Sequence, residues 1–198
     1  MSIRRLAIVA MVMFLGMGTL VQAALIDRGA DTLGNHLIYD TDLNITWYDA
    51  PAVQRNWSNS MTWAASLTVG NTTAGTWRLP TTLYQDGTVP SMGYIGFNFT
   101  SSEMGHLYYV ELENAAGGPL TNTSPFTNLL PGWYYSSSYS SAGLPFVCFF
   151  GDGYQGHTYA FNSNYALPVH SGNVPEPATI GLLSLGALSL LRRKRSKA

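Results

Sequence analysis

Runs of strand-forming residues near the start of the body of the chain predict a β-hairpin. Residues 37–39 (LIY) and 45–48 (ITWY) are rich in aliphatic, β-branched and aromatic side chains, which fit the pleated surface of a sheet. The polar stretch 40–44 (DTDLN) between them has the composition of a turn. We therefore expect two antiparallel strands joined by this turn.

A first helix is predicted after residue 55. Either Asn56 or Ser58 can cap its N-terminus, and Gly70 is expected to end it. Apolar or small residues recur at helical spacing between these limits, namely Trp57, Met61, Ala64, Ala65 and Thr68.

A second helix is predicted near residue 103. Thr100 and Glu103 have the spacing of a capping box, in which each side chain accepts a hydrogen bond from the other residue's backbone N–H. Residues 117–119 (GGP) are expected to stop the helix. Its apolar face consists of Met104, Leu107, Tyr108 and Leu112.

Beyond Pro131 the pattern changes to short strands separated by Ser- and Gly-rich turns. The expected strands lie around residues 133–135, 146–150, 158–161 and 166–169. Two helices among short antiparallel strands predict an α+β fold for the body of the chain, residues 24–173.

The N-terminal residues have the pattern of a secretory signal peptide. Arg4 and Arg5 precede an apolar run over 6–21, and Val21 and Ala23 are suited to the positions before a cleavage site. We expect cleavage after Ala23, which makes residues 1–23 the signal peptide. An uncleaved N-terminal anchor is the alternative.

The C-terminal residues 174–198 contain a short apolar segment followed by a basic tail. Residues 178–191 carry no charge, and as a helix they would be about 21 Å long, whereas a hydrocarbon core is about 30 Å thick. Four Arg and Lys residues at 192–195 and Lys197 follow, which places the tail on the cytoplasmic side and the body across the membrane. A simple tail anchor is the alternative to a sorting signal.

The order of these C-terminal features resembles the PEP-CTERM sorting signal of Gram-negative bacteria that make extracellular polysaccharide. Residues 174–177 read VPEP and stand directly before the apolar segment. The resemblance implies recognition by an exosortase, a membrane-embedded cysteine transpeptidase, with Pro175, Glu176 and Pro177 as the processing motif. A segment that is held in the membrane only until processing does not need the length of a stable anchor.

The charge of the body excludes one class of partner. Residues 24–173 contain three arginines, no lysine and ten acidic residues, so the body is strongly acidic although the whole chain has a formal net charge of −1. Nucleic-acid binding depends on clustered Lys and Arg. We therefore expect no nucleic-acid partner.

Cys148 is the only cysteine in the chain. It lies in the apolar run 145–150 (PFVCFF), which is typical of a core strand, and we expect a buried packing residue. A cysteine nucleophile would need a nearby base and an electropositive setting, and the sequence displays neither.

Two motifs resemble parts of metal sites. Residues 40–44 resemble the start of a calcium loop, but Ile45 stands where glycine is needed and Pro51 where a bidentate Glu is needed. Glu103 and His106 form a Glu-x-x-His pair, yet a di-metal bundle needs a second pair and two further carboxylates. We therefore expect no metal site and no other cofactor.

Aromatic residues are the main functional lead, because all twelve Tyr and all five Trp belong to the body. Their rings can stack on sugars while the hydroxyl or indole N–H forms hydrogen bonds. In predicted loops over 133–159 the candidate glycan-binding residues are Trp133, Tyr134, Tyr135, Asp152 and Tyr154. The alternative is that these rings fill the core.

Six segments resemble, in order, the Lcl C-terminal-domain family, whose modules are related to the C-type lectin fold and often carry a PEP-CTERM tail. They are HLIYDTDLNITWYDA, WSNSMTWAASL, GTWRLPT, SSEMGHLYYVEL, WYYSSS and ALPVHSG, and they span most of residues 30–172. The resemblance implies a hairpin whose strands pair near the chain ends, two helices, and long loops that carry any ligand site. The Glu-Pro-Asn, Gln-Pro-Asp and Trp-Asn-Asp triplets of calcium-dependent lectins are absent.

Members of this family include surface adhesins that bind sulfated or other polysaccharides. We therefore expect an exported, exosortase-processed protein that is transiently anchored in the membrane and then resides on the cell surface or in the extracellular matrix. We expect it to be non-catalytic and to contact extracellular polysaccharide. The alternative is a structural or protein-binding module of a biofilm matrix, without glycan affinity. An enzyme would need an acid–base or metal constellation, and the formylglycine-forming enzymes of the wider fold use paired cysteines.

Overall fold

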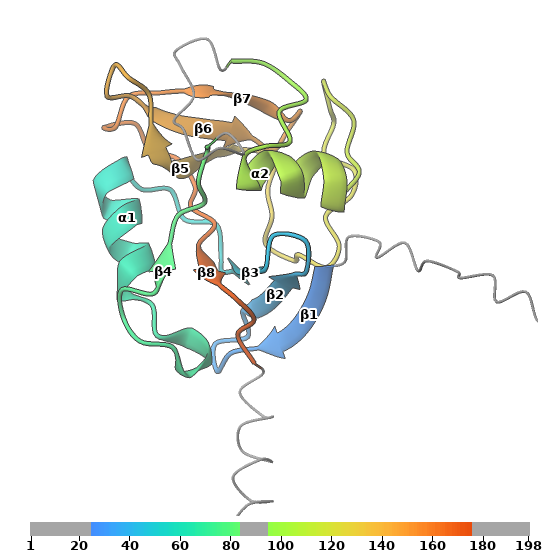
Figure 1. The fold of residues 1–198 in the computed structure, drawn as a ribbon, viewed down its shortest axis with the longest axis vertical. Coiled ribbons are helices and arrows are strands. Elements are labelled where there is room, and N and C mark those ends of the chain that lie inside the picture. The colour runs from blue at the N-terminus through green and yellow to red at the C-terminus, as the bar shows by residue number, and fades with distance from the viewer. Residues whose placement is uncertain (1–24, 84–94, 176–198) are drawn as a thin grey trace, which may run out of the picture.

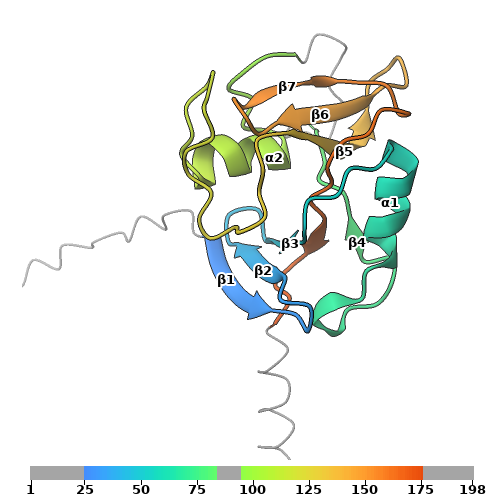
Figure 2. The same cartoon turned by 180° about the vertical axis from the view of Figure 1, so that it is seen from behind.

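The computed structural model describes residues 25–83 and 95–175. Two antiparallel sheets lie at opposite ends of the described body, and the helices α1 (Trp57–Ser66) and α2 (Glu103–His106) flank it (Figures 1 and 2). The α+β class predicted from the sequence is confirmed. The predicted signal peptide 1–23 and the predicted apolar helix 178–191 lie outside the described residues.

The larger sheet has the strand order β1-β2-β3-β8-β4, and the smaller one has the order β5-β6-β7. The strands are β1 (Leu25–Ala30), β2 (His36–Asp40), β3 (Ile45–Asp49), β4 (Trp77–Arg78), β5 (Trp133–Tyr139), β6 (Pro145–Phe149), β7 (Tyr154–His157) and β8 (Val169–Ser171).

The predicted hairpin is confirmed as β2 and β3, which pair from His36 opposite Asp49 to Asp40 opposite Ile45. The Asp40 carboxylate closes the turn by accepting hydrogen bonds from the backbone N–H groups of Asp42 (3.1 Å) and Leu43 (2.9 Å). Asn44 completes the turn at a positive φ of 51°, which Asn tolerates better than most residues. β3 then pairs with β8, so the early hairpin meets the end of the body.

Helix α1 begins as predicted and ends earlier. The Asn56 side chain accepts a hydrogen bond from the N–H of Asn59 (2.9 Å), so of the two predicted caps Asn56 is the one used. Leu67 already has extended backbone angles, and the helix ends at Ser66 instead of Gly70. Gly70 lies in a separate 3₁₀ turn, η1 (Val69–Asn71), at a φ of 66°.

The predicted capping box at the second helix is wrong. Ser102 is the N-cap of α2, and its hydroxyl accepts from the N–H of Gly105 at 2.9 Å. Glu103 instead forms two hydrogen bonds of 2.7 Å with the Arg78 guanidinium and accepts from the N–H of Thr81 at 2.6 Å. This bidentate ion pair ties the start of α2 to the edge strand β4.

The late strands are present, with shifted bounds. β5 and β6 contain the predicted segments 133–135 and most of 146–150, whereas β7 precedes the predicted segment 158–161 and β8 begins only at the last residue of 166–169. The shift at β7 has a local cause: the turn between β6 and β7 is tight, with Gly153 at a φ of 83°. The strand therefore starts at Tyr154.

The main core fills the space between the two sheets and α2. Its largest fully buried members include Trp47, Tyr108, Tyr134 and Phe150. Cys148 is fully buried in the same cluster, as the sequence predicted. Among residues 25–83 and 95–175, no helix combines the length and the apolar character that crossing a bilayer requires.

The Arg78–Glu103 pair generates the first prediction. Glu103→Gln is expected to lower the free energy of unfolding by about 2 kcal/mol, because it weakens charge-assisted hydrogen bonds to a partner that stays in place. Urea unfolding followed by Trp fluorescence measures the change. The matched control is Glu113→Gln, at an exposed position two residues beyond the π-helical segment Leu107–Glu111 that follows α2. An equal loss in both variants would contradict the assignment.

Burial raises the pKa of the Cys148 thiol far above its ordinary value, and the charge of Asp152 adds to the effect. Because the thiolate is the reactive form, the folded protein should not react with a thiol-specific disulfide reagent at pH 8 over hours. The same protein in guanidinium chloride should react with one equivalent within minutes. Rapid reaction of the folded protein would show that the thiol is accessible.

Candidate functional site

Two of the predicted glycan-binding residues lie on the surface of the three-stranded sheet. Trp133 faces Phe149 across β5 and β6, and Phe149 faces Tyr154 across β6 and β7, so three rings align across the sheet. The Trp133 and Phe149 ring centroids are 4.9 Å apart, and Trp133 and Tyr154 meet edge to face at 6.2 Å. Phe97 extends the line by an edge contact with Tyr154 at 5.3 Å.

We call this group the aromatic row: Trp133, Phe149, Tyr154 and Phe97. Trp133 is 39% exposed and Phe97 is 40% exposed. The sequence did not single out Phe149 or Phe97 for this surface, because their place in the row depends on strand register and on the bridge that pairs Gly96 with Gln155.

Tyr134 and Tyr135 are buried and point to the two core clusters on either face of β5. The Tyr134 hydroxyl accepts a hydrogen bond from the N–H of Leu130 at 2.9 Å. The Tyr135 hydroxyl donates to the carbonyl groups of Tyr159 (3.0 Å) and Asn162 (2.9 Å). As packed here, neither ring offers a face to a surface ligand.

Asp152 lies in the turn between β6 and β7. Its carboxylate accepts a hydrogen bond from the N–H of Tyr154 at 2.9 Å. Asp152 therefore shapes the turn that presents Tyr154. The structure brings three of the five candidate residues to one surface region and places the other two in the core.

A second site lies where the β2–β3 turn meets the second helix. Asp40, His106 and Glu111 each offer one potential ligand atom, and all three atoms lie within 4.8 Å of one another. The His106 Nε2 atom is 3.5 Å from Glu111 Oε1 and 3.8 Å from Asp42 Oδ2. We call Asp40, His106 and Glu111 the His–carboxylate cluster.

A change of helix type brings His106 and Glu111 together. In an α-helix, residues advance by about 100°, so positions five apart would lie about 140° from each other. After α2 the chain continues as the π-helical segment η2 (Leu107–Glu111), and the N–H of Leu112 bonds to the carbonyl of Leu107, five residues back. The wider turn places His106 and Glu111 on one face, and such π-segments are frequent at functional sites.

The cluster is buried, and two of its polar atoms are unsatisfied. The Glu111 side chain is 1% exposed and the His106 side chain 15% exposed. His106 Nε2 and Glu111 Oε1 are both inaccessible and have no hydrogen-bond partner. Asp40 is fully buried, and its carboxylate accepts from Trp47 Nε1 at 3.3 Å.

The charges around Glu111 are mainly negative. Burial, together with the negative charges of Asp40 and Asp42, raises the pKa of Glu111 to about 7. Burial also raises the pKa of Asp40, while its hydrogen bonds and the charge of His106 oppose that effect. Within the described part of the chain, none of the three arginines forms an ion pair with these side chains.

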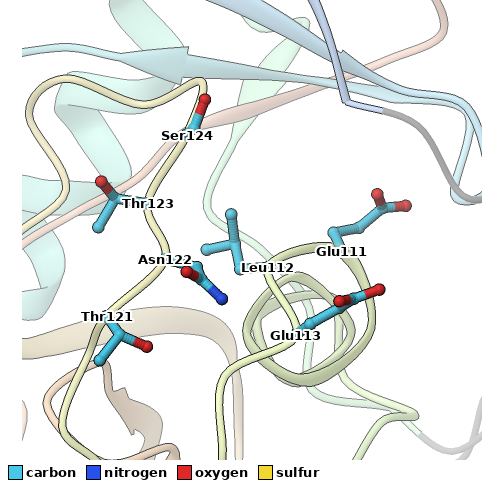
Figure 3. Close-up of a pocket in the computed structure, with 7 residues that line it drawn as sticks. All are labelled: Glu111, Leu112, Glu113, Thr121, Asn122, Thr123 and Ser124. Carbon is cyan, nitrogen blue, oxygen red and sulfur yellow. The ribbon is translucent and has the colours of Figure 1, made fainter.

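A shallow pocket of about 440 Å³ adjoins the end of η2. Its lining residues are Glu111, Leu112, Glu113, Thr121, Asn122, Thr123 and Ser124. Figure 3 shows the carboxylates of Glu111 and Glu113 extending away from the 121–124 loop. Glu111 therefore belongs to both the pocket lining and the His–carboxylate cluster, and its carboxylate lies beside His106 in the cluster.

Sequence reasoning grouped these residues differently. It paired His106 with Glu103, which the structure places on Arg78 instead. It also separated the Asp-rich turn 40–44 from the helix that the fold packs beside it. Glu111 was missed because an α-helical period puts it on another face from His106.

The processing motif lies at the end of the described chain. Pro175 is the last described residue, and Glu176 and Pro177 lie outside. Residues 173–195 match the PEP-CTERM protein-sorting motif. The match indicates an exported protein that is targeted to exosortase and transiently anchored in the membrane at this segment. No curated protein and no solved structure matches the chain.

Proposed function

We propose that the body of this exported protein is a non-catalytic component of the cell surface or extracellular matrix that contacts polysaccharide through the aromatic row. The observation that carries the proposal is the alignment of partly exposed rings across three neighbouring strands. A line of partly exposed rings suits a chain of sugar units, whose apolar faces stack on aromatic side chains.

The sheet holds these rings in fixed positions. The Trp133 ring contacts the rings of both Phe149 and Tyr154. Cross-strand pairs of aromatic residues stabilise the strands that carry them. A binding surface that is already ordered loses little conformational entropy when it takes up a ligand. Loop residues without such support would bind sugar less favourably.

Charge narrows the class of polysaccharide. The body has three arginines and ten acidic residues, and Arg78 is already paired with Glu103. A sulfated or uronic-acid chain would meet repulsion instead of ion pairs. We therefore propose a neutral polysaccharide as the ligand.

The test is binding of the full chain, purified in detergent, to neutral and sulfated glycans and to the host's own exopolysaccharide. Saturable binding to a neutral glycan is expected, and Trp133→Ala and Tyr154→Ala should each weaken it at least about tenfold, or about 1.4 kcal/mol. Isothermal titration calorimetry measures the affinity, and circular dichroism verifies the fold.

Phe161→Ala is the matched control, because this ring is 76% exposed and lies outside the aromatic row. It should leave the affinity unchanged. Equal losses in the control and the two test variants would reject the row as the site. Absence of binding to every glycan would reject the proposal and favour a structural or protein-binding matrix module.

A further inference from the structure

The His–carboxylate cluster joins two parts of the chain that are 66 residues apart at Asp40 and His106. Asp40 is the last residue of β2, whereas His106 is the last residue of α2 and Glu111 the last residue of η2. We propose that Asp40, His106 and Glu111 bind one divalent cation of the first transition row, Zn²⁺ or Mn²⁺, which fastens the hairpin turn to the helix.

The spacing of the ligand atoms fits a small cation. Around a metal with bonds of about 2.1 Å, neighbouring tetrahedral ligands lie about 3.4 Å apart. His106 Nε2 and Glu111 Oε1 are separated by 3.5 Å. The three ligand atoms lie within 4.8 Å of one another. The hydrogen bonds from Asp42, Leu43 and Trp47 hold the Asp40 carboxylate in place, so a modest shift of the Glu111 and His106 side chains toward it would bring all three atoms to bonding distance of one ion.

The unsatisfied atoms point to a ligand independently of the spacing. Glu111 Oε1 belongs to a side chain that is 1% exposed, and it lacks a hydrogen-bond partner, as does His106 Nε2. Buried polar groups without partners are uncommon in folded proteins and call for an explanation such as a bound ion. A cation between these two atoms would satisfy both at once.

Electrostatics favours a cation at the same point. The carboxylates of Asp40 and Glu111 are buried together, and Asp42 Oδ2 lies 3.8 Å from His106 Nε2 at the more exposed side. A protonated His106 would supply one positive charge against these three carboxylates, and burying the remaining like charges is costly. A divalent ion would neutralise two carboxylates and leave Asp42 to attract the incoming ion.

The donor set selects the class of metal. One imidazole nitrogen with two carboxylate oxygens suits Zn²⁺ or Mn²⁺ better than Ca²⁺ or Mg²⁺, which prefer oxygen ligands alone. The Trp47 indole N–H donates to Asp40 Oδ2 and orients that carboxylate, as outer hydrogen bonds commonly do at metal sites. The cluster shares no residue with the aromatic row, so this inference does not depend on glycan binding.

The experiment uses the full chain in detergent, stripped with EDTA and dialysed against separate solutions of Zn²⁺, Mn²⁺ and Ca²⁺. Elemental analysis should find one equivalent of Zn²⁺ or Mn²⁺ per chain and no retained Ca²⁺. The bound ion should raise the Tm, because it binds only the folded state. Co²⁺ should give visible d–d absorption bands that depend on His106.

Glu111→Gln and His106→Gln should weaken the binding at least about tenfold. Glu111→Gln removes a buried charge next to two carboxylates, so its folding should be intact, and it keeps the test valid if His106→Gln fails to fold. The matched control is His36→Gln, which removes a histidine paired at 2.8 Å with Asp27 near the surface. Absence of a stoichiometric metal, or binding that survives Glu111→Gln, would overturn the proposal.

Discussion

Strand β3 holds the described body together, because it pairs with β2 on one side and with β8 on the other. All five of its residues are buried, so its side chains pack on both faces of the larger sheet. Thr46 extends the second pairing: its hydroxyl donates to the carbonyl of Gly172 at 2.7 Å and accepts from the N–H of Val174 at 3.0 Å. Residues from the beginning and the end of the body are thereby fixed in one unit.

The same strand also connects the sheet to the long segment that follows the second helix. The Asp49 carboxylate accepts hydrogen bonds from the N–H and hydroxyl of Thr127 (2.6 and 2.9 Å) and from the N–H of Asn128. Asp49 is 1% exposed, and these donors satisfy its buried carboxylate oxygens. Two buried acidic side chains of this protein therefore differ in their hydrogen bonding: both oxygens of the Asp49 carboxylate accept hydrogen bonds, whereas Glu111 Oε1 has no partner.

Local sequence signals predicted the elements whose cause is local. The hairpin follows from two apolar runs around an Asp-rich turn, and α1 follows from the Asn56 cap and its helical spacing. The role of a residue whose partner is distant in the sequence was predicted wrongly. Glu103 has the spacing of a capping residue, but Arg78 provides a stronger partner from β4, and sequence alone could not place that arginine there.

The functional residues show the same division. Trp133 and Tyr154 were singled out because ring type and polar neighbours are local features, although the structure places them on β5 and β7 instead of in the predicted loops. The burial of Tyr134 and Tyr135 depends on both faces of β5 being covered. The His–carboxylate cluster was not predicted, because it needs a π-helical turn and a tertiary contact. The C-type-lectin-like fold implied by the family resemblance stays a prediction.

The last residues of the described body determine how far the sorting motif lies from the folded surface. Val174 is 1% exposed and packs with Leu37, Tyr48 and Trp77, and the processing motif begins at the next residue. Within the described residues, no linker separates the buried Val174 from the first residue of the motif. The segment that targets this protein to exosortase therefore begins directly at the surface of the folded body.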